Sequence, residues 1–356
     1  RTDGYDGSVC GAEGDEGFVD AGRADVEERE LSLEDIPKTE TEVMINLANP
    51  AAALRWWQLP AAGVGLARME FIINNLIKIH PMALARFDQV KEGKVRREIE
   101  RITRGFEDKC DYFTQTLAEG IGMIAASQHP RPVIVRLSDF KTNEYAQLIG
   151  GRAFEPEEAN PMLGWRGASR YYSERYRDGF ALECAALRRV RERIGLENVV
   201  IMVPFCRTVT EADRVLEELA RNGLVRGENG LQIYVMAEIP ANIGRAQAFA
   251  ARFDGFSIGS NDLTQLVLGI DRDSDELAPL FDERDEAVVS LIGDLIERGR
   301  GAGRKVGLCG QAPSDHPEFA RTLVELGIDS ISVSPDSFIA VSRHIAEAEA
   351  SRREGL

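Results

Sequence analysis

Eight short runs rich in β-branched and other apolar residues recur along this chain, separated by longer segments of helical periodicity. The runs are VMINL (43–47), VGLA (64–67), VIVRL (133–137), VVIMVPF (199–205), LQIYVMAEI (231–239), FSIGS (256–260), KVGLCG (305–310) and SISVS (330–334). Strands that are apolar on both faces and joined by helices form parallel sheets. Eight of them closing on themselves make a (β/α)₈ barrel, which is the α/β fold we expect; an open doubly wound sheet is the alternative.

One connection is much longer than the others. The segment from Glu70 to His129 is rich in helix formers and exceeds a usual strand-to-helix loop. We therefore expect extra helices inserted after the second strand.

Composition excludes several classes of protein. The net charge is −16, and no run of Lys and Arg interrupts it, so nucleic acid is not an expected partner. Apolar stretches such as Val199 to Phe205 are far shorter than the roughly 20 residues that cross a bilayer, and no signal peptide is visible. Five cysteines without a CxxC pair indicate reduced thiols. We expect a cytoplasmic protein that does not contact membranes.

The first residues differ chemically from the rest. Residues 1–42 hold 14 acidic and four basic side chains, and six of the first 22 residues are glycine. The acidic stretch around Pro37 is typical of a linker. We interpret residues 1–38 as the end of an upstream domain plus a linker, and 39–356 as the barrel; a disordered acidic tail is the alternative for the first part.

Polar side chains stand where the predicted strands end. In a parallel barrel these ends converge on one mouth, where the reactive groups of barrel enzymes lie. The residues are Arg68, Arg136, Glu238, Asn261, Asp262 and Cys309. Guanidinium groups bind phosphoryl or carboxylate oxygens, carboxylates suit Mg²⁺, and a thiol can exchange protons.

Each of these residues also has a structural explanation. The arginines can be halves of ion pairs, Asp262 can cap the following helix, and Cys309 can be a small buried apolar residue. Glu238 is harder to explain in this way, because a carboxylate between apolar runs is costly to bury without a cation or hydrogen bonds. No GxxxxGK[ST] loop is present, and none of the four histidines has a partner at metal-ligand spacing.

At these same residues the sequence resembles the phosphoenolpyruvate-utilising enzymes. The matching stretches follow the family order. They are NLANPAAALRWWQLPAAGVGLARMEFIINNLIKIHPMAL, VIVRLSDFKTNEYAQLIGG, EANPMLGWRGASRYY, VMAEIPAN, FDGFSIGSNDLTQLVLGIDRDS and VGLCGQAPSDHPEF. The resemblance implies a barrel that binds pyruvate or phosphoenolpyruvate with Mg²⁺.

The resemblance also implies roles for individual residues. Glu238 and Asp262 match the family's metal ligands, and Cys309 matches its acid/base at the methyl carbon. The remaining matches bind the phosphoryl group or line the substrate. They are Arg68, Arg136, Arg166, Gly259, Ser260, Asn261 and Arg272.

Two parts of such enzymes are missing from this chain. They are the ATP-grasp domain and the swivelling domain whose histidine carries the phosphoryl group; the opening DGSVCGAEGDEGFV resembles the last strands of the latter. We expect the last step of a reaction that turns ATP, pyruvate and water into AMP, phosphoenolpyruvate and phosphate, in a homodimer. A phosphoenolpyruvate-binding or dimerisation module without turnover, or another phosphotransferase of the family, is the alternative.

Overall fold

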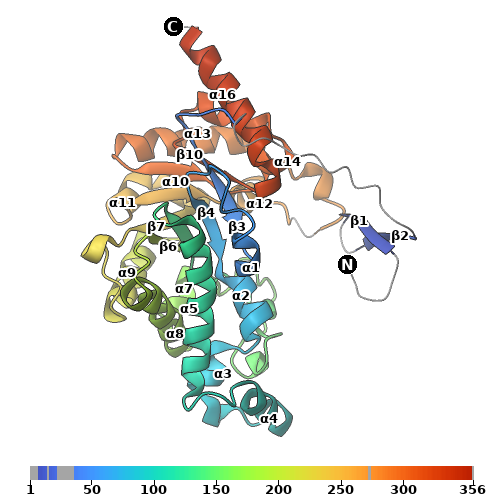
Figure 1. Cartoon of the computed structure of the whole chain (residues 1–356), viewed down its shortest axis with the longest axis vertical. Helices are drawn as coiled ribbons and strands as arrows, with labels where there is room; N and C mark the ends of the chain where they lie inside the picture. The colour runs from blue at the N-terminus through green and yellow to red at the C-terminus, as the bar shows by residue number, and fades with distance from the viewer. Residues whose placement is uncertain (1–6, 14–15, 22–35, 272–273, 355–356) are drawn as a thin grey trace.

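Eight parallel strands close into a barrel in which the last strand pairs with the first (Figure 1). The computed structural model describes residues 7–13, 16–21, 36–271 and 274–354. The barrel strands are β3 (Glu42–Leu47), β4 (Val64–Arg68), β5 (Val133–Arg136), β6 (Val199–Val203), β7 (Ile233–Ala237), β8 (Gly255–Ile258), β9 (Lys305–Leu308) and β10 (Ser330–Val333). Each lies within or next to one predicted run, so the predicted (β/α)₈ barrel is confirmed and the open sheet is wrong.

The strands are buried on both faces, as their composition predicts. In β3, Val43 and Ile45 belong to the large core between strands and helices, whereas Met44 belongs to a smaller cluster inside the barrel. This alternation follows from the two-residue period of a strand.

The helices surround the strands (Figure 1). In chain order they are α1 (Pro50–Ala53), α2 (Met69–Ile72), α3 (Pro81–Ala85), α4 (Gly93–Ile102), α5 (Lys109–Gln128), α6 (Thr142–Tyr145), α7 (Ala168–Tyr171), α8 (Arg177–Arg188), α9 (Val209–Arg221), α10 (Pro240–Gly244), α11 (Ala246–Ala250), α12 (Ser260–Leu268), α13 (Glu286–Gly301), α14 (Ala312–Asp315), α15 (Phe319–Glu325) and α16 (Phe338–Glu354). Within the described residues, no helix is both long enough and apolar enough to cross a membrane.

Two insertions build a helical lobe beside the barrel. The first, α2 to α5, follows the second barrel strand and confirms the predicted extra helices. The second, α6 to α8, follows β5 and was not expected from the sequence. Figure 1 shows α3, α4, α5 and α8 extending away from the strands, and α5 packs on α8. A buried hydrogen bond helps to join the two insertions, because Glu155 of the second accepts from the ring of His80 in the first. Arg170, in the same insertion as Glu155, pairs with this carboxylate.

Residues before the barrel form a separate small sheet. Strands β1 (Gly7–Glu13) and β2 (Glu16–Ala21) pair antiparallel and do not join the barrel. The four cysteines whose side chains the structure describes are free thiols: Cys110, Cys184, Cys206 and Cys309.

Candidate active site

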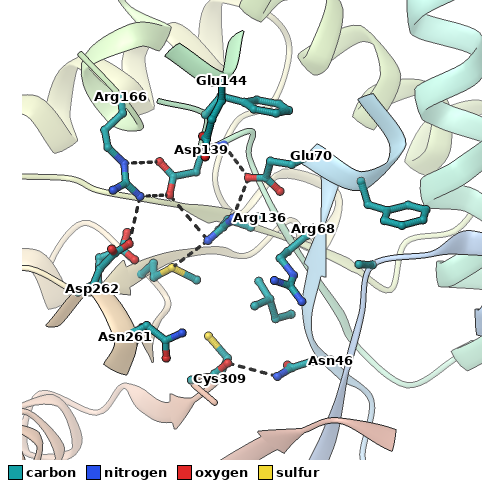
Figure 2. Close-up of a pocket in the computed structure, with 18 of the residues that line it drawn as sticks. Asn46, Arg68, Glu70, Arg136, Asp139, Glu144, Arg166, Asn261, Asp262 and Cys309 are labelled. Atoms are coloured by element: carbon teal, nitrogen blue, oxygen red, sulfur yellow. Dashed lines mark hydrogen bonds and ion pairs between the residues drawn. The ribbon is translucent and has the colours of Figure 1, made fainter. Parts of the chain in front are cut away.

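A cavity of about 480 Å³ opens where the barrel strands end. We call it the carboxyl-end cavity. Side chains from separate segments line it and point toward one another (Figure 2). Among the lining residues are Asn46, Arg68, Glu70, Arg136, Asp139, Arg166, Glu238, Gly259, Asn261, Asp262 and Cys309. The position matches the mouth at which barrel enzymes hold their reactive groups.

Two arginines stand side by side because of strand register. Arg68 ends β4, Arg136 ends β5, and the two residues are register partners. Arg136 donates to Glu70 over 2.8 Å and lies 3.7 Å from Asp139. Burial alone would lower the pKa of Arg136, but Glu70 and Asp139 raise it above its usual value. Arg136 is therefore a fixed positive charge in the cavity.

Three buried carboxylates converge on the same place. One oxygen from each of Asp139, Glu238 and Asp262 lies within 4.8 Å of the others. Glu238 and Asp262 were predicted to meet; Asp139 was missed. Asp139 follows β5 by three residues, so the rule that polar residues after strands face the mouth would have found it.

Arg166 neutralises part of this acidic cluster. Its guanidinium donates to both oxygens of Asp139, over 3.0 and 2.5 Å, and to Asp262 over 3.0 Å. Its charge lies 4.1 Å from the centre of the Phe205 ring, a cation–π distance. Burial would lower the pKa of Arg166, but Asp139 and Asp262 raise it beyond the usual range.

Glu238 resists ionisation in the absence of a further cation. Burial is the main reason that its pKa lies well above the usual range, and the negative charges of Asp262 and Asp139 add to the effect. Arg166 and Arg136 offset only part of it. A divalent ion among the three carboxylates would favour their charged forms, and carboxylate oxygens are the ligands that such an ion prefers. The residues present therefore fit a metal ion.

The backbone around Glu238 is held tightly. The amide of Phe205 donates to Glu238 over 2.6 Å from a left-handed conformation with φ of 47°. Such a conformation costs a bulky residue about 1–3 kcal/mol and is found mainly at functional sites. On the other side, a Cβ at Gly259 would lie 2.8 Å from the second oxygen of Glu238. Glycine at this position leaves room for the carboxylate.

Cys309 reaches the cavity from the strand opposite the arginines. In Figure 2 its sulfur points toward the middle of the cavity, and Asn46 donates to its carbonyl over 3.2 Å. The side chain is only 5% exposed, and burial raises the pKa of its thiol to about 11. The ground state is therefore the thiol, which can donate a proton.

Of the remaining predicted residues, some line the carboxyl-end cavity and others do not. Gly259 and Asn261 line the cavity, but Ser260 does not, because its hydroxyl turns away and donates to buried Glu283. Arg272 lies outside the described residues. Glu70 was missed by sequence reasoning; it accepts from Arg136 and from the amide of Asp139, over 2.7 Å, and so positions both.

Comparison with known proteins shows the family of the chain. The model of the PEP-binding domain of PEP-utilising enzymes matches residues 21–350. The chain belongs to the PEP-utilising enzymes. Three relatives within this family are phosphoenolpyruvate synthases from Synechocystis sp., Aquifex aeolicus and Escherichia coli. They are 54%, 50% and 51% identical over 97%, 96% and 97% of this chain. The matches cover 42%, 45% and 43% of those proteins, so the chain spans less than half of their length.

Proposed function

We propose that this chain is the part of a phosphoenolpyruvate synthase that binds pyruvate and forms phosphoenolpyruvate. In this reaction the enolate of pyruvate takes a phosphoryl group from a histidine on an upstream domain. The observation that carries the proposal is the convergence of three carboxylates, three guanidinium groups and one thiol on the carboxyl-end cavity. The relatives of the chain are named for the same product.

The carboxylates would hold Mg²⁺ and orient the substrate. Glu238 and Asp262 are its proposed ligands, and Asp139 is close enough to join them. When bound, the ion stabilises negative charge on the keto oxygen of pyruvate. Arg166 holds Asp139 and Asp262 in place, because it donates hydrogen bonds to both carboxylates.

The arginines would assist transfer of the phosphoryl group, and the cysteine would transfer the methyl proton. Arg68 and Arg136 offer guanidinium groups to the equatorial oxygens of the transferred phosphoryl group, whose charge grows in the transition state. Cys309 as thiolate removes a methyl proton from pyruvate, and as thiol returns it in the reverse direction. Burial raises the pKa of its thiol to about 11, so the thiol form dominates at neutral pH and the return of the proton is the easier direction.

Residues 1–38 fit the proposal as the end of the phosphohistidine domain plus a linker. In the complete enzyme an ATP-grasp domain would then phosphorylate the histidine, and the barrel would complete the reaction. A second reading, a phosphoenolpyruvate-binding or dimerisation module, requires no thiol at the cavity. The position of Cys309 therefore favours catalysis.

The test is exchange of the methyl protons of pyruvate with D₂O, followed by proton NMR. Mg²⁺ and inorganic phosphate are added, the latter to fill the phosphoryl position. Cys309→Ala should abolish exchange while calorimetric binding of oxalate, which resembles the enolate, stays within about twofold. Cys110→Ala is the matched control, because Cys110 is a half-buried thiol at the start of α5 and does not line the cavity. Unchanged exchange in Cys309→Ala would remove this residue from the mechanism.

A further inference from the structure

An apolar layer inside the barrel lies beneath the carboxyl-end cavity. Its side chains form one packed cluster and come from β3 to β7 and from the end of β9: Met44, Leu66, Ile134, Val200, Met202, Met236 and Cys309. Leu66, Met236 and Cys309 also line the carboxyl-end cavity. Ile134 instead lines a second cavity, of about 360 Å³, at the amino ends of the strands. The layer thus has two faces, and we call Leu66 and Met236 the apolar floor of the first cavity.

The apolar floor is closely packed. Leu66 is 6% exposed and Met236 is 2% exposed. Arg136 donates to the sulfur of Met236 over 3.9 Å. On another side, a Cβ at Gly259 would lie 3.1 Å from the Cγ of Met236. A methionine side chain is flexible by itself, but these neighbours hold this one in place, so the floor has little room to yield to a larger group.

The apolar floor suits the one apolar part of pyruvate. Most side chains that line the carboxyl-end cavity are charged or carry amides, and these suit the carboxylate, the keto oxygen and the transferred phosphoryl group. The methyl group has no polar atom. When Cys309 moves a methyl proton, the methyl carbon lies against its sulfur and so faces the apolar cluster to which the sulfur belongs. Burial of the methyl group there is favourable, because it removes apolar surface from water.

The same packing limits the size of the substrate. We propose that Leu66 and Met236 determine which 2-oxo acid the site accepts, and that they select the three-carbon acid. The next larger acid, 2-oxobutyrate, carries one more carbon on the atom that Cys309 deprotonates, and this carbon would need space that the apolar floor fills. The inference rests on the proposed function, because it places the methyl group at Cys309.

Leu66→Ala tests the apolar floor in the D₂O exchange assay with Mg²⁺ and inorganic phosphate. Exchange at the carbon next to the keto group is measured for pyruvate and for 2-oxobutyrate, and kcat/KM is obtained for each. An apolar pocket distinguishes one methylene by about 10- to 200-fold, so the wild type should prefer pyruvate at least about tenfold. Leu66→Ala should reduce this preference by about tenfold or more, because the space left by the side chain admits the extra carbon. Leu66→Val, a smaller change that preserves the fold better, should reduce it less.

Ile134→Ala is the matched control. Ile134 belongs to the same layer, is 7% exposed and loses the same number of carbon atoms, but it lines the other cavity. A loss of stability alone would affect both variants, whereas only Leu66→Ala should change the preference for pyruvate. Oxalate has no methyl group, so its affinity in calorimetry should stay within about twofold in Leu66→Ala.

The outcomes separate this inference from the proposed function. Equal exchange of the two acids by the wild type would overturn the role of the apolar floor. An unchanged preference in both Leu66 variants, or an equal change in Ile134→Ala, would overturn it as well. No exchange of pyruvate by the wild type would instead refute the proposed function, and the inference with it.

Discussion

Removing the charge of Arg166 should lower the stability of the folded protein, and Mg²⁺ should restore part of this stability. Arg166 is 4% exposed and makes three hydrogen bonds to Asp139 and Asp262. Arg166→Met keeps most of the side-chain volume but leaves these buried carboxylates without their cation. Breaking a buried ion pair in this way costs about 3–5 kcal/mol. At roughly 2 °C per kcal/mol for a chain of this length, the Tm should fall by about 6–10 °C.

The assay is thermal unfolding with and without Mg²⁺. Because the variant has a more negative cluster, Mg²⁺ should bind it more tightly and raise its Tm more than that of the wild type. Arg101→Met is the matched control, since Arg101 pairs with Glu98 on the exposed surface of α4, and its Tm should not change. If the variant has the same Tm as this control, or gains no more from Mg²⁺ than the wild type, Arg166 does not neutralise the buried carboxylates.

Two further substitutions probe buried acids. Glu238→Gln should weaken Mg²⁺-dependent oxalate binding by about tenfold or more, because it replaces a charged ligand; equal affinities with and without metal in the wild type would contradict the metal site. Glu183→Gln should remove a pH dependence of the stability of the folded state. Burial raises the pKa of Glu183 from 4.5 to about 7, so the folded state holds a proton that the unfolded state has lost. The wild type should therefore lose stability in urea as pH rises from 4.5 through 7, and Glu183→Gln should not.

The barrel could be predicted because its signal is local and repeated. Each strand is a short apolar run, and each is followed by a helical period. Arg68, Arg136, Glu238 and Cys309 could be predicted to line the mouth for the same reason, since each ends or directly follows such a run. Their roles, by contrast, came from the resemblance to a family.

Other parts of the site carry no such signal. Arg166 lies in a loop about 30 residues beyond β5, and only folding brings it to Asp139 and Asp262. Ser260 shares a motif with Asn261, yet its hydroxyl faces Glu283 rather than the cavity. Neighbouring residues at the start of a helix point in different directions, so sequence proximity does not decide which of them meets the substrate.

Hydrophobic periodicity is enough to predict eight strands, their order along the chain and the residues at their ends. Which charges pair, which thiols are buried and where the cavities lie depend on the folded structure. The reason is that hydrophobic periodicity follows from local geometry, whereas pairing and burial depend on closure of the barrel. Ile258 and Cys309 are 51 residues apart in the chain, and the thiol of Cys309 reaches the carbonyl of Ile258 because β8 and β9 are neighbours in the closed sheet.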